Sequence, residues 1–208
     1  ALASEEMFDE TVSVADKHNI CVIHDFAYGA FGFDGKKPRS FLQTEGAKEV
    51  GIETYTLSKT YNMAGWRVAF AVGNPSVVGA INKLQDYLYA SLFGAVQYAA
   101  AEALTGDQRA VREFVQIYEK RRDHFIQNLR NIGWDVEPPQ GTFFAWLPIP
   151  KGFTSQEFSD LLLNKAHVVT APGNGFGTAG EGYVRIGLLD SEERLAEAAQ
   201  RIKKLHIF

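Results

Sequence analysis

The stretch TLSKTYNMAGWR, residues 56–67, places one lysine where it could react. Lys59 follows an apolar segment predicted as a strand and comes after two hydroxyl residues, Thr56 and Ser58. A partly desolvated lysine near another cation has its ammonium form disfavoured, so its amine can attack a carbonyl and form a Schiff base. Arg67 could be that cation, or it could bind a phosphate bidentately with help from Thr56 and Ser58. A surface lysine and a salt-bridged arginine remain the alternative on spacing alone.

An acidic residue and a tyrosine follow the apolar run ICVIHD. Asp25 ends this predicted strand, and Tyr28 comes three residues later. A carboxylate at the end of a strand can pair with a protonated ring nitrogen, and a nearby tyrosine hydroxyl can donate a hydrogen bond to a phenolate oxygen. The alternative makes Asp25 a cap or turn residue and Tyr28 a packing residue. His24 alternates with Asp25, so we expect it to point to the other side and to have a structural role.

Arg185 lies within the apolar run GYVRIGLL. An arginine in an apolar strand is costly unless it is paired, and its partner could be a substrate carboxylate or a structural Asp or Glu. The stretch APGNGFG, residues 171–177, matches neither G-x-G-x-x-G nor a P-loop, so we interpret it as a turn. The sequence contains no metal-ligand pattern among its five histidines and no G-x-S-x-G elbow, so a metal site and a serine hydrolase are not indicated.

Composition limits the class of protein. The chain has 208 residues, 46% of them hydrophobic, with a net charge of −4, which is typical of a globular protein with one or two domains. Without a basic patch, nucleic acid is not a favoured partner, and we interpret Lys120–Arg122 as a solvated helix face. The single cysteine, Cys21, is expected to be a buried strand residue in a reducing, cytoplasmic protein. No apolar run has membrane-spanning length.

The elements that must position these residues begin as an open α/β sheet. Residues 4–19 predict a helix with Ser4 as N-cap, and ICVIHD predicts a strand buried on both faces. After a glycine-rich aromatic loop, residues 51–58 and the run WRVAFAVGN predict two more strands. Pro75 fits the first turn of a helix.

The second half of the chain changes character. A 3.6-residue period predicts a long helix that stops at Gly133. Strands are predicted over GTFFAWLP, HVVTAPG and GYVRIGLL, with a helix over SQEFSDLLLNKA. A last helix follows, with Asp190 as its N-cap and Glu193 in the capping-box position.

Together these motifs resemble the class I/II aminotransferases, pyridoxal-phosphate enzymes of fold type I. The resemblance rests on HDFAY, SKTYNMAGWRVAFAVGN, GTFFAWLP, APGNGFG and YVRIGLL in this order, and it covers nearly the whole chain. It implies an α/β fold that is the C-terminal portion of a fold type I transferase, with part of a mainly parallel sheet and an α+β small domain. The domains would be the end of the large cofactor domain at 1–85, connecting helices at 86–130 and the small domain at 131–208.

The resemblance also implies roles for the candidate residues. Lys59 would carry pyridoxal 5′-phosphate as a Schiff base and then act as the catalytic base. Asp25 would pair with the pyridine nitrogen and Tyr28 would hydrogen-bond the ring oxygen. The cofactor phosphate would be bound by Arg67, with Thr56 or Ser58 assisting, and Arg185 would bind the substrate α-carboxylate.

The chain departs from the family in length, because family members are typically about twice as long. The resemblance implies that the N-terminal arm, the phosphate-binding turn, the ring-stacking aromatic residue and the Pro-x-Asn-Pro-x-Gly segment are missing. We therefore expect the 208-residue chain alone to bind cofactor poorly and to be inactive.

Several functions share these motifs. The leading hypothesis is transfer of an amino group between an L-amino acid and a 2-oxo acid, in a homodimer of the intact protein. The alternatives are a β-lyase of the same fold, a non-catalytic effector-sensing domain and a partner-binding half-protein. The sequence most resembles methionine-salvage or diaminopimelate-type aminotransferases. Phe31, Phe33 and Tyr61 are predicted either to line the pocket or to pack in the core.

Overall fold

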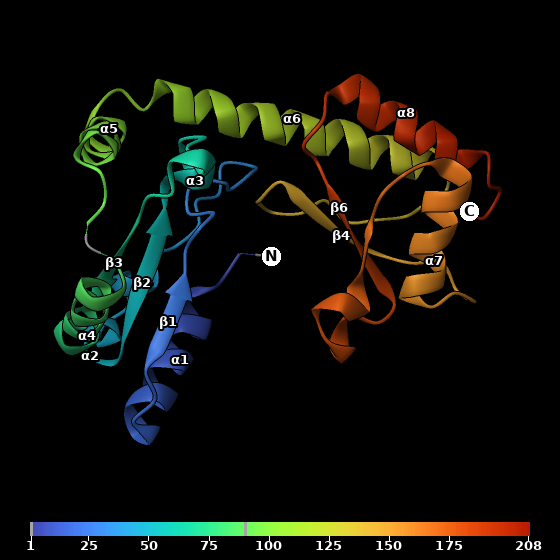
Figure 1. Ribbon diagram of the computed structural model, residues 1–208. Coiled ribbons are helices and arrows are strands. Elements are labelled where there is room, and N and C mark those ends of the chain that lie inside the picture. Colours follow the sequence, from blue (N-terminus) through green and yellow to red (C-terminus); the bar gives the residue numbers. More distant parts are fainter. Residues whose placement is uncertain (1, 90) are drawn as a thin grey trace. The chain divides into compact units, whose positions relative to one another are not determined.

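The chain forms two compact units. The computed structural model describes residues 2–89 and 91–208, and it divides the chain into unit 1, Ala1–Val115, and unit 2, Gln116–Phe208 (Figure 1). The predicted division into residues 1–85, 86–130 and 131–208 stays a prediction. Each unit contains helices and a three-stranded sheet, so the predicted α/β class is confirmed.

Unit 1 is built on a mixed sheet with the strand order β1-β2-β3. Strands β1 and β2 are parallel, with Asp25 opposite Thr54, whereas β2 and β3 are antiparallel, with Thr56 opposite Ala69. The helices and strands of this unit are α1 (Glu5–His18), β1 (Val22–Asp25), η1 (Phe41–Gln43), α2 (Ala47–Val50), β2 (Gly51–Thr56), α3 (Leu57–Thr60), η2 (Ala64–Trp66), β3 (Ala69–Gly73), α4 (Pro75–Leu88), α5 (Gly94–Thr105) and the first turns of α6 (Arg109–Asn131).

Local sequence signals set the helix ends of unit 1. Ser4 caps α1 by accepting a hydrogen bond from the Met7 amide, as predicted. Asn74 caps α4, and Pro75 occupies its first turn, where a missing N–H costs nothing. Asn19 ends α1 in the left-handed conformation, which asparagine tolerates better than most residues.

Unit 2 packs helices on one face of a second sheet, with the strand order β4-β6-β5. A single cluster of buried apolar side chains, including Phe125, Leu147 and Phe158, forms its core. Its elements are the rest of α6, β4 (Phe144–Pro148), α7 (Ser155–Leu161), η3 (Leu162–Ala166), β5 (Ala171–Pro172), η4 (Gly173–Phe176), η5 (Thr178–Gly180), β6 (Tyr183–Gly187) and α8 (Glu192–Lys203).

The predicted burial of the first strand is wrong. Ile23 is 65% exposed, and Cys21 is an exposed residue that precedes β1. An apolar strand is covered on both faces only when other elements pack against it. The described residues provide such packing for one face, which carries His24 against Phe8 and Phe41.

The run Lys120–Arg122 is not a uniformly solvated face. The Arg122 side chain is 2% exposed, forms an ion pair with Asp123 at 2.7 Å and donates to the Pro139 carbonyl at 3.1 Å. Helical periodicity explains the error, because the third residue of a charge run can turn toward the core and bury its aliphatic stem. Sequence alone does not reveal that a carbonyl is available to it.

Several element boundaries also differ from the prediction. The strand predicted over residues 51–58 ends at Thr56, and the strand predicted over HVVTAPG is reduced to Ala171–Pro172. Ser191, not Asp190, caps the last helix, and the Asp190 carboxylate accepts from the Ser191 amide instead. Adjacent Asp and Ser residues are both good caps, so only the observed backbone distinguishes them.

Candidate active site

Three segments of unit 1 meet at one edge of its sheet. The parallel strands β1 and β2 end there at Asp25 and Thr56, and β3 begins there at Ala69 because it runs antiparallel to β2. The turn that carries Lys59 leaves this edge, and Arg67 enters it just before β3. Loops at the carboxyl ends of strands are where open α/β sheets bind their ligands.

Lys59 lies on a short helical turn, α3, rather than at the end of a strand. Thr56 caps this turn: its hydroxyl accepts from the Ser58 amide at 3.1 Å and donates to the Ser58 hydroxyl at 2.8 Å. Leu57 is fully buried in a small apolar cluster with Met63 and Val68. This anchor fixes the turn to the unit and leaves Lys59 half-buried, which is the partial desolvation that the sequence suggested.

Arg67 is held in an uncommon backbone conformation. Its φ of 54° lies in the left-handed region, which non-glycine residues seldom occupy. Its guanidinium donates to the Ala64 carbonyl at 2.9 Å, and this is its one hydrogen bond within the described residues. Arginine has five N–H donors, so most of them remain available to an anion.

Asp25 and Tyr28 are placed by the end of β1. Asp25 is exposed, and its carboxylate has no hydrogen bond or ion pair with any residue that the structure describes. Tyr28 is half-buried, with its ring against the buried Phe31 at 6.3 Å. Phe33 is buried as well, so both phenylalanines belong to the core of this loop.

Glu53 fixes the loop that follows Asp25, a role that sequence reasoning missed. This carboxylate is buried and accepts from Ser40 Oγ at 2.9 Å and from the Phe41 amide at 2.9 Å. It also pairs with His24 Nδ1 at 2.9 Å, which confirms the structural role expected for His24. The two ends of loop 26–40 are therefore tied to one side chain. The available signal was a charged residue within the apolar strand GIETYT.

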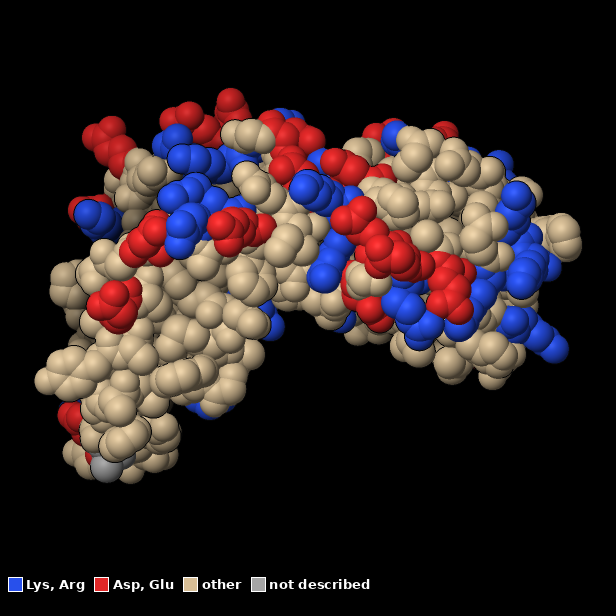
Figure 2. All heavy atoms as spheres, turned by 90° about the horizontal axis from the view of Figure 1, so that it is seen from above, with Lys and Arg blue, Asp and Glu red and all other residues tan. Residues whose placement is uncertain are grey.

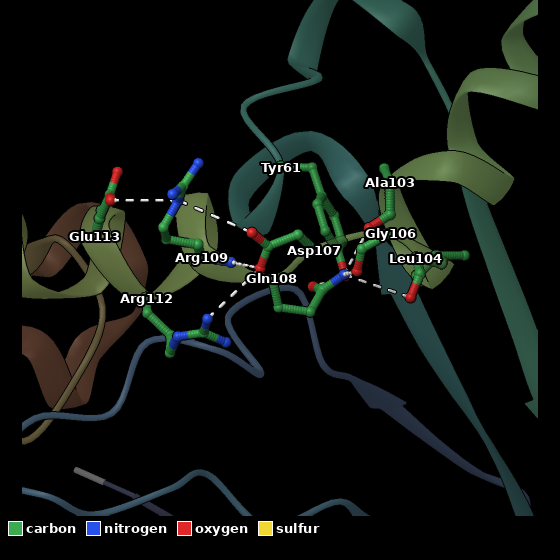
Figure 3. A network of polar contacts seen from close by, with 9 residues as sticks. All are labelled: Tyr61, Ala103, Leu104, Gly106, Asp107, Gln108, Arg109, Arg112 and Glu113. Carbon is green, nitrogen blue, oxygen red and sulfur yellow. Dashed lines mark hydrogen bonds and ion pairs between the residues drawn. The ribbon is translucent and has the colours of Figure 1, made fainter.

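A second set of polar contacts ties the lysine turn to the start of α6 (Figure 3). Tyr61, which ends the turn, donates to Gln108 Oε1 at 2.9 Å. Gln108 Nε2 in turn donates to the carbonyls of Ala103 at 3.0 Å and Gly106 at 2.9 Å, at the end of α5. Burial, assisted by the nearby Tyr55, raises the pKa of Tyr61 above its ordinary value. The Tyr61 ring also packs against the apolar cluster around Leu57, which agrees with the core-packing alternative, while its hydroxyl ties the lysine turn to the start of α6.

Arg185 belongs to unit 2, on the central strand β6. Its neighbours Val184 and Ile186 point into the core, so the half-buried Arg185 faces the other side of the sheet. The guanidinium lies over the rings of Phe144 and Phe176, 4.3 Å and 4.4 Å from their centroids. It makes no hydrogen bond or ion pair with the residues described. Of the two partners that the sequence left open, a structural carboxylate is therefore not found among them.

A cavity of unit 1 lies beside the lysine turn. It has a volume of about 760 Å³ and lies between β3, α4 and α5, with Phe70, Tyr89 and Leu92 in its wall. None of the predicted site residues is among the described residues that line it. The described part of the chain also holds no cluster of potential metal ligands. In the same residues, no helix is long and apolar enough to span a membrane.

Comparisons with known proteins identify relatives of nearly the whole chain. The family model for aminotransferase class I and II matches residues 1–202. The L-glutamine–4-(methylsulfanyl)-2-oxobutanoate aminotransferase of Bacillus subtilis is 65% identical over 208 residues, which are 100% of this chain and 52% of that protein. The LL-diaminopimelate aminotransferase of Halothermothrix orenii is 44% identical over 207 residues, 100% of this chain and 53% of that protein.

A solved structure gives the same result at the level of the fold. Apo-BacF from Bacillus subtilis matches with a TM-score of 0.94 and 48% identity, over 99% of this chain and 52% of that chain. The chain spans about half the length of the curated relatives that it matches.

Proposed function

Because the chain belongs to the aminotransferase class I and II family, we propose that it forms the lysine-bearing part of a pyridoxal-phosphate-dependent aminotransferase. The enzyme would exchange an amino group between an L-amino acid and a 2-oxo acid. One observation carries the proposal: Asp25, the capped turn with Lys59, and Arg67 converge at one edge of the unit 1 sheet.

The donor set at this edge fits the cofactor on which class I/II aminotransferases depend. The remaining N–H groups of Arg67 and the hydroxyl of Ser58 suit a phosphate, and Thr56 assists by donating to the Ser58 hydroxyl oxygen. The Asp25 carboxylate suits a protonated ring nitrogen, and the amine of Lys59 suits a carbonyl carbon. When bound, the cofactor supplies an electron sink for the negative charge that develops at the substrate α-carbon.

The residues of this chain then have separate tasks. Lys59 would hold the cofactor through its amine, and its Nζ would take the proton from the substrate α-carbon. Asp25 would pair with the ring nitrogen, and Tyr28 would hydrogen-bond the ring oxygen. Arg185 binds the substrate α-carboxylate through its N–H edge.

The substrates and partners of the whole protein are part of the same proposal. The relatives named above act, by their names, on glutamine with 4-(methylsulfanyl)-2-oxobutanoate and on LL-diaminopimelate. We place this protein nearer the first of these, because 65% identity exceeds 44%. The same proposal keeps the division of the chain into the end of a cofactor domain (1–85), connecting helices (86–130) and a small domain (131–208).

An exposed apolar surface on unit 1 supports a homodimer. Helix α4 has no buried residue, and Tyr87, Phe93 and Tyr98 are exposed around the α4–α5 region. Figure 2 shows that uncharged side chains predominate over this part of unit 1. Soluble monomers seldom expose large apolar patches, so we expect the intact protein to cover this surface with another part of the assembly.

The test is a pair of lysine substitutions in the complete gene product. Lys59→Ala is expected to lower amino-group transfer by at least about 10²-fold, because it removes both the attachment point and the base. Borohydride reduction followed by peptide mass analysis should find the cofactor on Lys59 in the unmodified protein. The control, Lys48→Ala, changes an exposed lysine of α2 and should leave both readouts unchanged.

Two outcomes would contradict the proposal. Retention of full transfer by Lys59→Ala would show that the lysine is not catalytic. Release of pyruvate and ammonia in place of amino-group exchange would identify a β-lyase. The 208-residue chain measured in parallel is expected to bind the cofactor weakly, and a strong borohydride-trapped product from it would overturn that expectation.

A further inference from the structure

The Arg185 guanidinium contacts two aromatic rings, one from each side of its strand. In the sheet of unit 2, β6 lies between β4 and β5. Phe144 comes from β4, and Phe176 comes from the η4 turn directly after β5. Their ring centroids lie 4.3 Å and 4.4 Å from the Arg185 Cζ. The two contacts therefore restrain the guanidinium from opposite neighbours of the central strand.

Neither contact is a hydrogen bond, so both leave the N–H groups of the guanidinium unpaired. A cation over an aromatic ring is attracted through the ring face, whereas the N–H groups point outward in the guanidinium plane. No described residue accepts a hydrogen bond from Arg185 or forms an ion pair with it. A half-buried cation in this state presents the edge that a carboxylate binds bidentately.

The position of Phe176 is itself supported. Trp146, which lies opposite Arg185 in the β4–β6 register, contacts the Phe176 ring edge-on with centroids 5.5 Å apart. The turn that carries Phe176 needs its glycines: a Cβ at Gly173 would overlap the Gly180 carbonyl, and Gly177 has a φ of 120°. The stretch APGNGFG, first interpreted only as a turn, thus carries the Phe176 ring that contacts Arg185.

We propose that Phe176, together with Phe144, is a positioning residue that orients the Arg185 guanidinium for a carboxylate ligand. The inference rests on the proposed function, in which that carboxylate is the α-carboxylate of the substrate. A long arginine side chain otherwise samples many rotamers, and restraining it beforehand lowers the ordering cost of binding. Phe176 acts through Arg185 and does not itself need to contact the substrate.

The experiment replaces the ring of Phe176 in the complete, cofactor-loaded gene product. Phe176→Leu keeps apolar volume but removes the ring face, and Phe176→Tyr keeps the ring. The side chain is 52% exposed, so neither change should prevent folding. Phe144→Leu provides a second variant at the other ring. Phe208→Leu is the control, since Phe208 is another exposed aromatic of unit 2, 38% against 52% for Phe176, that stacks on Trp134 instead.

Two readouts separate positioning from a structural defect. The first is the dissociation constant of hexanoate, a carboxylate without an amino or oxo group, measured by calorimetry beside its neutral amide, hexanamide. The second is the division of the kinetic effect between KM and kcat. Phe176→Leu is expected to weaken hexanoate binding and raise KM by about five- to tenfold, with kcat nearly unchanged. Hexanamide binding should not change, and Phe176→Tyr should restore both values.

The outcomes distinguish this inference from the proposed function. If Arg185→Gln weakens hexanoate binding but Phe176→Leu and Phe144→Leu do not, the positioning role is wrong while the carboxylate site stands. If Arg185→Gln leaves hexanoate affinity unchanged, Arg185 is not the carboxylate site and the inference falls with it. The aminotransferase proposal is judged separately, by the lysine substitutions.

Discussion

The two units of the chain differ in how their cores are built. Unit 2 has one continuous apolar cluster, into which α6, α7, α8 and its sheet all contribute buried side chains. Unit 1 has two small clusters, one around Leu57 and one around Phe41, and much of its apolar surface is exposed. Unit 1 nevertheless carries Asp25, Lys59 and Arg67. The proposed site residues Asp25, Lys59 and Arg67 therefore lie in the unit with the smaller buried apolar clusters.

Polar contacts do more of the positioning in unit 1. Glu53 ties the two ends of loop 26–40 to β2, and the Tyr61–Gln108 contact ties the lysine turn to the start of α6. In unit 2 the Arg185 guanidinium instead contacts two aromatic rings, those of Phe144 and Phe176. The comparison predicts that apolar truncations will be most damaging in unit 2, and that loss of single polar partners will matter most in unit 1.

The largest contrast is expected between two phenylalanine truncations. Phe158→Ala removes a fully buried ring of unit 2 and should lower the free energy of unfolding by about 3–5 kcal/mol. Phe93→Ala removes a ring of unit 1 that is 75% exposed and should change it by less than about 0.5 kcal/mol. Denaturant titration of this chain followed by circular dichroism measures both. Equal losses would mean that the exposed surface of unit 1 is covered in solution.

Removing the Glu53 side chain should have the next largest effect. Glu53→Ala leaves the Phe41 amide and the Ser40 hydroxyl without their acceptor, and we expect it to cost about 3 kcal/mol. Glu53→Gln keeps the size and part of the accepting capacity, so it should cost less. Hydrogen exchange should locate the change, with faster exchange across loop 26–40 and unchanged protection in unit 2. Uniformly faster exchange in both units would contradict a local role.

Periodic elements of this fold could be predicted from the sequence, because their signals are local. The helices α1 and α6 follow the 3.6-residue period, and the β6 strand alternates between buried and exposed positions. The helical turn Leu57–Thr60 was not predicted, because a threonine such as Thr56 is favoured both within strands and at helix N-caps.

The candidate site was predicted in part for the same reason. Asp25, Lys59 and Arg67, which stay predicted site residues, were singled out because each adjoins a recognisable strand, and the pairing of β1, β2 and β3 brings these strand ends to one edge. The partners that hold them were not found. Glu53 and Ser40 are 13 residues apart, and Tyr61 and Gln108 are 47 apart, so these pairs exist only once the chain is folded.

Loss of the Tyr61 hydroxyl should have a moderate effect that depends on pH. Tyr61→Phe removes the hydrogen bond to Gln108 and is expected to cost about 1 kcal/mol at neutral pH. Burial raises the Tyr61 pKa above its ordinary value of 10.0, so the folded state holds this proton more tightly than the unfolded state. Its contribution is full below pH 10 and declines as pH rises through the folded pKa.

The pH dependence is isolated by comparing the two proteins. The stability difference between the unmodified chain and Tyr61→Phe should shrink between pH 9 and pH 11, since all other groups titrate in both. A difference that grows over this range would show that the Tyr61 phenolate, not the phenol, is favoured in the folded chain.

The smallest effect is expected at an exposed helix start in unit 2. Thr154 accepts from the Glu157 amide at 3.2 Å, and the Glu157 carboxylate accepts from the Thr154 amide at 2.8 Å, which forms a capping box. Thr154→Ala should cost about 1 kcal/mol or less. The Thr154 amide and hydroxyl lower the Glu157 pKa below 4.5, so the contribution of Glu157 is present above that pH and is lost as pH falls through the folded pKa. The stability difference between the unmodified chain and Glu157→Gln should therefore be larger at pH 6 than at pH 3.

This cap lies on the unit with the continuous core, so its loss should fray α7 without unfolding the unit. Faster hydrogen exchange confined to the first turn of α7 would indicate such a local effect, whereas faster exchange throughout unit 2 would indicate a weakness of the core.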